Sequence, residues 1–249
     1  MSARCEAGVL KVENVSVTFA HGGKSTSVLS DFSFSFEPTI RYGILAPSGS
    51  GKTSLLRAIA GLELYSGRIS LGDNVAWRRV GKTVLQPQRP PLLPWYTVRE
   101  NLKWAASLGK APSAGVADAA ITTYNLGAHK DKLPRQLSGG WKHIAAYAMS
   151  TCVRPDLLLA DEPFSGVDHF TRKALWDIVK RNESGVSYQI FVTHDPAEAV
   201  AVCDKILLCS GPPLRIVRTV NVDRPSDAAL VEAAALGLEE MVLSLYSTP

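Results

Sequence analysis

The chain has 249 residues, 46% of them hydrophobic, which is enough to bury a sizeable core as one domain or as one domain with a large inserted subdomain. Its net charge of +4 is small and dispersed, so the clustered basic surface of a nucleic-acid-binding protein is not expected. No apolar run approaches the roughly 18 residues of a membrane span, and residues 1–8 lack a signal-peptide pattern, so a cytoplasmic protein is expected. Four cysteines without metal-ligand spacing are expected to be reduced packing residues: Cys5, Cys152, Cys203 and Cys209.

Strand patterns dominate the beginning of the chain. Apolar and polar side chains alternate over residues 10–45, most clearly at 32–36, and a glycine-rich turn occupies 21–23. This segment predicts a mostly antiparallel β layer. Residues 42–45 predict a short buried strand.

A phosphate-binding loop (residues 46–53, the phosphate loop) follows this strand, and a helix is predicted over 53–60 with Gly61 as its cap. Glycines let successive N–H groups surround phosphate oxygens, Lys52 reaches the outer phosphates and the Thr53 hydroxyl ligates Mg²⁺. Ala46 stands where glycine is commoner; a positive φ there would cost about 1 kcal/mol, so we expect ordinary backbone or a tolerated strain. The predicted nucleotide-binding residues are Ala46, Pro47, Ser48, Gly49, Ser50, Gly51, Lys52, Thr53 and Ser54.

Helical signals begin near residue 87. Thr97 and Glu100 form a capping box that opens a helix to about 107, and 114–124 predicts a second helix after a loop. A helical subdomain is therefore predicted at 87–154, inserted into an α/β core of 1–86 and 155–225. Within it, Ser138, Gly139 and Gly140 precede a helix and offer N–H groups to an anion, although a plain helix cap is the alternative.

The core then resumes with strands and helices in alternation, which implies a largely parallel sheet. The predicted elements are a strand at 157–160, a helix at 171–181, a strand at 189–193, a capped helix from Asp195, strands at 206–208 and 214–222, and a helix from 226 to about 245 in a C-terminal segment 226–249.

Polar residues that could take part in catalysis follow two of these strands. Asp161 and Glu162 come directly after strand 157–160, where one acid is needed near Mg²⁺ and another to orient or deprotonate water. An acidic loop is the simpler alternative. His194 follows strand 189–193; a lone histidine is usually a satisfied core residue, but its place beyond the acid pair favours a function.

Taken in order, these motifs resemble those of an ATP-binding cassette (ABC) transporter ATPase subunit, over about residues 9–225. Residues 92–95, 134–140 and 161–164 are most similar to the nitrate, sulfonate and taurine importer group. The resemblance implies a P-loop NTPase (RecA-like) α/β core with an antiparallel β layer and an inserted α-helical subdomain. It implies ATP binding and hydrolysis that energise import of a small solute of that class, with ATP and Mg²⁺ as cofactors.

The resemblance also implies roles for matching residues. Phe19 would stack on adenine, although packing in the core is the alternative, and Gln86 would contact Mg²⁺ or the attacking water. The catalytic residues would be Glu162 as base, with His194 at the γ-phosphate, Gln86 and Lys52. The metal ligands would be Thr53, Gln86 and Asp161.

Partners follow from the same resemblance. Ser138, Gly139 and Gly140 would cap ATP held by a second cassette in a head-to-tail homodimer, with 165–168 across the interface. Transmembrane permease subunits would be contacted through about 86–96, and an extracytoplasmic substrate-binding protein indirectly. These partners imply a peripheral place on the cytoplasmic face of the membrane.

The chain departs from the family pattern at four positions. Trp141 stands where glutamine or methionine is usual, Ile144 and Met149 replace expected arginines, and Pro87 replaces an acidic or polar residue. None of these removes a group that contacts phosphate in the same chain. Trp141 is interpreted as packing, with a specialised, slow cassette as the alternative.

Two other functions remain open. One is a cassette that binds ATP but hardly hydrolyses it. The other is a nucleic-acid ATPase of the same superfamily, which would carry a long coiled coil where only about 85 residues separate Lys52 from Ser138.

Overall fold

The structure is a computed structural model and describes residues 8–22, 24–72, 74–75, 83–109, 115–181 and 186–222. The chain forms two compact units: the first unit is Met1–Arg78 with Ser187–Pro249, and the second unit is Arg79–Val186. The predicted subdomain boundaries at 87 and 154 stay a prediction, and the predicted helix at 226–249 lies outside the described residues.

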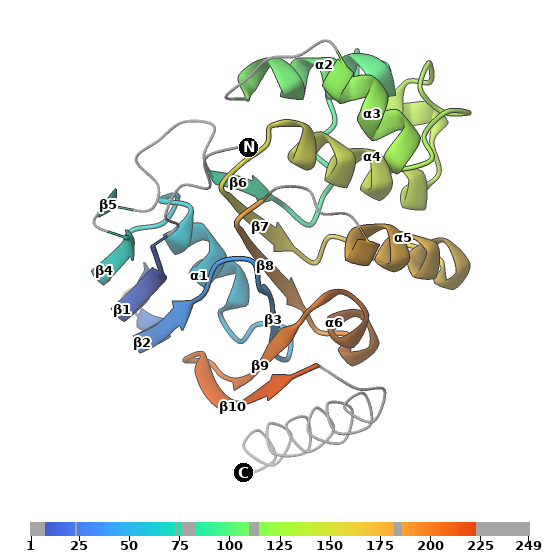
Figure 1. The fold of residues 1–249 in the computed structure, drawn as a ribbon. Coiled ribbons are helices and arrows are strands. Elements are labelled where there is room, and N and C mark those ends of the chain that lie inside the picture. Colours follow the sequence, from blue (N-terminus) through green and yellow to red (C-terminus); the bar gives the residue numbers. More distant parts are fainter. Residues whose placement is uncertain are drawn as a thin grey trace. The chain divides into compact units, whose positions relative to one another are not determined.

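The first unit contains a four-stranded antiparallel sheet with the order β2-β1-β4-β5 (Figure 1). Its strands are β1 (Leu10–His21), β2 (Lys24–Phe36), β4 (Ser66–Leu71) and β5 (Asn74–Val75). Alternation along β2 buries Phe32 and Phe36 and exposes Ser33 and Ser35, as expected for a strand with one covered face. The predicted antiparallel layer is confirmed, and β4 and β5 extend it beyond the segment that the alternation indicated.

A second set of strands in the first unit has the order β10-β9-β3-β8. They are β3 (Arg41–Leu45), β8 (Tyr188–Thr193), β9 (Lys205–Ser210) and β10 (Arg215–Asn221). β3 is parallel to β8 and β9, whereas β10 is antiparallel to β9. Helix α1 (Lys52–Ile59) follows β3 and α6 (Pro196–Val202) follows β8, so the predicted alternation of strand and helix is confirmed.

The second unit combines a parallel strand pair with a group of helices. β6 (Thr83–Gln86) pairs with β7 (Leu157–Asp161), whose five residues are all buried. The other elements are α2 (Val98–Leu108), α3 (Gly115–Thr123), the short 3-10 helix η1 (Pro134–Gln136), α4 (Gly139–Cys152) and α5 (His169–Arg181). Helices α2, α3 and α4 pack on one another, as the green to yellow ribbons in Figure 1 show.

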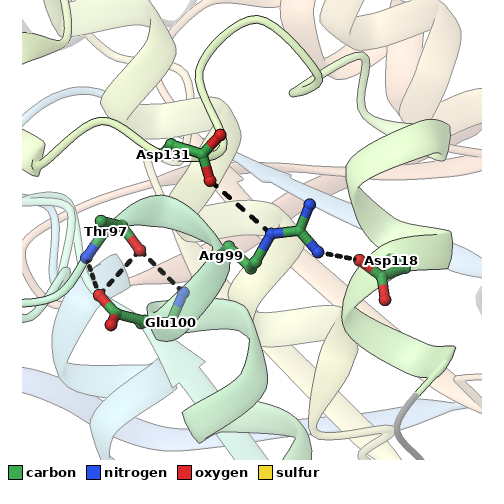
Figure 2. Close-up of polar contacts among 5 residues, drawn as sticks. All are labelled: Thr97, Arg99, Glu100, Asp118 and Asp131. Carbon is green, nitrogen blue, oxygen red and sulfur yellow. Dashed lines mark hydrogen bonds and ion pairs between the residues drawn. The ribbon is translucent and has the colours of Figure 1, made fainter.

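Helix α2 begins with the predicted capping box (Figure 2). The Thr97 N–H donates to the Glu100 carboxylate at 2.7 Å, and the Glu100 N–H donates to the Thr97 hydroxyl at 3.3 Å. Arg99 of the same turn donates to Asp118 of α3 at 2.5 Å and lies 3.9 Å from Asp131. The contact between Arg99 and Asp118 holds the beginning of α2 against α3.

In the described ranges, no helix has the length and apolar character that a bilayer crossing requires.

A candidate nucleotide-binding site

The phosphate loop joins β3 to α1 in the first unit, which is the strand, loop and helix order that the motif requires. Gly49 has a φ of 77° and Gly51 a φ of 104°, in the left-handed region that glycine adopts without strain. A Cβ atom on Gly51 would lie 2.5 Å from the carbonyl oxygen of Val28. Glycine is therefore required at residue 51 by both backbone conformation and space.

Lys52 begins α1, and its buried side chain folds back over the loop. Its Nζ donates to the carbonyl oxygens of Ala46 and Pro47, each at 2.7 Å. Among the described residues, no side chain caps the amino terminus of α1, so its first-turn N–H groups are left for an anion. The loop thus presents a cationic group and N–H donors, which suit a phosphate.

Ala46 has ordinary backbone geometry, because the positive φ values among described non-glycine residues fall at other positions. Its N–H lies 3.4 Å from the carbonyl oxygen of Thr193, its acceptor. The expectation of ordinary backbone at this position is confirmed, and the strained alternative is excluded.

His194 lies beside the phosphate loop in the same unit. β3 and β8 are parallel and Leu45 is paired with Thr193, so Ala46 and His194 directly follow neighbouring strand ends. Ligands of α/β sheets bind at such carboxyl ends. His194 is exposed, and Asp195 caps α6 through its side chain. His194 is therefore exposed rather than a core histidine, which the simpler interpretation required.

Phe19, on β1 of the first unit, is 42% exposed. This exposure excludes the alternative in which its ring only fills the core. The ring keeps a surface on which a planar base can stack.

In the second unit the acid pair ends β7, as predicted. Asp161 is the last residue of the strand and is buried. Glu162 follows with a φ of 44°, and this left-handed conformation costs a residue with a side chain about 1–2 kcal/mol. Backbone strain of this kind is concentrated at functional sites.

Gln86 ends the neighbouring strand β6 and is paired with Ala160, the residue before Asp161. Its side chain is 1% exposed, and within the described chain neither Oε1 nor Nε2 has a hydrogen-bond partner. Leaving a buried amide unpaired costs about 1–3 kcal/mol. Mg²⁺ takes oxygen ligands, so an unpartnered amide oxygen at the strand end that carries Asp161 fits a magnesium site.

The segment 137–140, called the signature segment below, leads into α4. Ser138 and Gly139 are exposed, and no described side chain caps the helix. A Cβ on Gly140 would lie 3.2 Å from Thr171 and 3.3 Å from Val167, so glycine allows α4 to pack closely there. Ser138 and Gly139 are thus accessible at the beginning of a long helix, whereas Gly140 is buried.

His143 is a buried residue of α4 that sequence reasoning did not single out. Its Nδ1 lies 2.7 Å from the carbonyl oxygen of Pro163, and because a carbonyl only accepts, Nδ1 carries the proton. Burial lowers the pKa of His143, and the hydrogen bond to Pro163 opposes this shift. His143 thereby anchors the backbone directly after Glu162.

Trp141 is half-buried, and its ring lies against His129 with centroids 4.1 Å apart. Ile144 and Met149, which replace the expected arginines, are buried. The ring contact within the second unit supports the packing interpretation of Trp141. Its partner His129 carried no signal in the sequence.

The cysteines within the described residues are free, buried thiols, which supports their predicted packing role. Burial raises the pKa of Cys152 and of Cys209 to about 12 in each case. Cys5 lies outside the described residues.

Comparison with known proteins agrees with these motifs. A model of the ABC transporter family matches residues 29–165, more than half of the chain. The chain belongs to the ABC transporter family.

Relatives of this ABC chain match it over most of its length. It is 33% identical over 237 residues to the aliphatic sulfonates import ATP-binding protein SsuB of Bacillus licheniformis, covering 92% of this chain and 91% of that protein. It is 34% identical over 226 residues to the nitrate import ATP-binding protein NrtC of Synechococcus elongatus, covering 87% of this chain and 34% of that protein. The solved ATP-binding cassette MJ0796, dimeric and bound to ADP and phosphate, shares the fold with a TM-score of 0.74 at 22% identity, covering 86% of this chain and 99% of that one.

These findings confirm the predicted P-loop NTPase fold class of this ABC chain. They also confirm that it is an ATPase that uses ATP and Mg²⁺. The transport function is confirmed as well, and the nucleic-acid and binding-only alternatives are not favoured.

Proposed function

We propose that this chain hydrolyses ATP to energise the import of a small solute of the nitrate, sulfonate and taurine class. The names of its relatives, which include sulfonate and nitrate import subunits, support this class of cargo. The observation that carries the assignment of the site is the buried, unpartnered amide of Gln86 beside the strand end that bears Asp161.

The phosphate loop and the beginning of α1 bind the nucleotide phosphates. Lys52 exchanges its two loop carbonyls for phosphate oxygens, and N–H groups of the loop beyond Pro47 donate to the same anion. Thr53, Gln86 and Asp161 would hold Mg²⁺, which would neutralise phosphate charge. Phe19 stacks on the adenine.

Glu162 orients the attacking water and accepts its proton, and His194 contacts the γ-phosphate. Each residue, within its own unit, follows the carboxyl end of a parallel strand, where α/β sheets bind their ligands. The chemistry is in-line phosphoryl transfer to water, in which positioning and charge stabilisation supply most of the acceleration.

Partners complete the transporter. Ser138, Gly139 and Gly140 bind the nucleotide of a second copy in a head-to-tail homodimer, and residues 86–96 contact permease subunits. The dimeric cassette with the same fold and the import subunits among the relatives support these partners. An extracytoplasmic substrate-binding protein delivers the solute, and the chain works peripherally on the cytoplasmic face of the membrane.

Replacing the catalytic acid tests the assignment of the site. Glu162→Gln should keep ATP binding, because the phosphate loop is intact, and should slow hydrolysis by roughly 10²- to 10⁴-fold, the usual contribution of a positioned general base. Filter binding of labelled ATP and phosphate release measure the two effects. A variant that hydrolyses ATP at nearly the normal rate would exclude Glu162 as the base, and a wild-type complex that binds ATP without hydrolysis would favour the binding-only alternative.

The cargo requires the partner proteins. The permease is purified through its association with this chain, and its substrate-binding protein is titrated with nitrate, taurine, an alkanesulfonate and bicarbonate in a calorimeter. Binding of one of the first three supports the proposed class. Binding of bicarbonate alone, or of none of the four, would contradict it.

A further inference from the structure

Two residues far apart in the sequence meet in the second unit. The Nε2 of Gln88 donates to Oε2 of Glu162 at 3.0 Å. The register of β6 on β7 explains this contact, because Gln86 is paired with Ala160 and each partner lies two residues further along its chain. Residue 88 is therefore carried to residue 162 by strand pairing.

Contacts constrain both the backbone and the side chain of Glu162. Its backbone has a φ of 44°, and the next residue, Pro163, is anchored through its carbonyl oxygen by the buried ring of His143. The side chain beyond this backbone has several rotatable bonds, whose ordering costs up to about 2 kcal/mol. The amide of Gln88 donates to the Glu162 carboxylate and so favours one of its orientations.

We propose that Gln88 is a positioning residue for Glu162, so that the segment 86–96 controls the orientation of the catalytic acid. The proposal rests on the proposed role of Glu162 as base. A base aligns a water only from a defined direction, and a misplacement of about 1 Å can cost a large factor in rate. Gln88 belongs to the segment 86–96, which precedes α2 and is assigned to the permease contact. A permease that shifts this segment therefore also shifts the amide of Gln88.

The orientation of Glu162 affects the chemical step rather than the affinity for ATP. Gln88→Ala should therefore lower kcat about tenfold and leave KM for ATP within about twofold, because the phosphate loop is untouched. Gln88→Glu, which keeps the size but replaces the donor by an acid, should be slower still. Gln88→Lys, which keeps a donor of similar reach, should return kcat to within about threefold of wild type.

The assay uses the purified cassette assembled with its permease, with steady-state hydrolysis measured against ATP concentration. Gln189→Glu, the same chemical change on β8 in the first unit, is the matched control and should keep wild-type kcat. Thermal unfolding should be unchanged in the Gln88 variants, because the pair is exposed and surface substitutions are usually within about 0.5 kcal/mol. In a Glu162→Gln background, Gln88→Ala should not reduce single-turnover hydrolysis further.

Each result decides the proposal. Wild-type or higher kcat in Gln88→Ala and Gln88→Glu overturns it, as does an equal loss in the Glu162→Gln background, which would indicate a merely structural role. These outcomes leave the proposed function intact because the wild-type complex still hydrolyses ATP. A wild-type complex without ATPase activity overturns both proposals.

Discussion

The two glycines of the phosphate loop have similar backbone conformations but different surroundings. At Gly49 a Cβ would meet nothing within 4 Å, whereas at Gly51 it would lie 2.5 Å from the Val28 carbonyl oxygen. Both have φ values in the left-handed region. The pair therefore separates the cost of strain from the cost of a steric clash.

Gly49→Ala should lower the free energy of unfolding by about 1 kcal/mol, the cost of left-handed backbone with a side chain. Gly51→Ala should lower it by about 2 kcal/mol or more, because a backbone oxygen must also move. Urea unfolding without nucleotide measures both. Equal losses would show that the loop relaxes around residue 51.

Trp141 is the most visible departure from the family pattern, and its ring is held by His129. Trp141→Gln should lower the free energy of unfolding, and a double-mutant cycle with His129→Ala should give a coupling of about 0.5–1.5 kcal/mol, typical of paired rings. ATPase activity per folded molecule should stay roughly unchanged. A stable variant with severalfold faster turnover would instead show that Trp141 slows closure, since that gain needs less than about 1.4 kcal/mol of barrier.

His143 connects α4 to the segment after β7. Burial lowers its pKa below the ordinary 6.5, so the unfolded chain binds more protons than the folded one at mildly acidic pH. The stability due to neutral His143 is complete above pH 6.5 and is lost as pH falls through the lower, folded pKa. His129 has a pKa shifted in the same direction, through burial and then Lys132.

His143→Gln keeps a donor for the Pro163 carbonyl oxygen but removes the titration. Between about pH 7 and pH 5, the free energy of unfolding measured in urea should therefore fall less in the variant than in wild type. The decrease that remains comes from groups that include His129. An identical slope in the variant would show that His143 is not a source of the pH dependence.

Several elements could be predicted because their cause is local. Thr97 and Glu100 are three residues apart and cap α2, and the phosphate loop carries its own glycines. β4 (Ser66–Leu71) escaped prediction because it includes Gly67, whose φ is 94°, and its strand conformation comes from pairing with β1. The contacts of Gln88 with Glu162 and of His143 with Pro163 depend on strand register and helix packing, which no local pattern specifies.

At the scale of the whole molecule, the fold implies a cassette that works as a pair. Glu162→Gln should form dimers with saturating Mg-ATP, because the signature segment binds the nucleotide of a second copy and slow hydrolysis preserves that state. Sedimentation velocity measures the dimer. Adding Ser138→Arg, which fills the approach to the N–H groups of α4, should return the variant to a monomer.

The same measurement is repeated with the permease present, since the membrane partner holds two cassettes close together. Unchanged monomers with Mg-ATP in both settings would contradict the homodimer. Dimers that persist with Ser138→Arg would place the contact elsewhere.

The pairing of Leu45 with Thr193 also affects how the protein is synthesised. β3 gains β8 only after the chain has been made beyond residue 193, and β9 only after residue 210, although the phosphate loop leaves the ribosome much earlier. Pairings between such distant segments form slowly compared with local helices. Until these pairings form, the phosphate loop lacks the neighbouring strands that position it. ATP in the cell can therefore stabilise the finished cassette but not the growing chain.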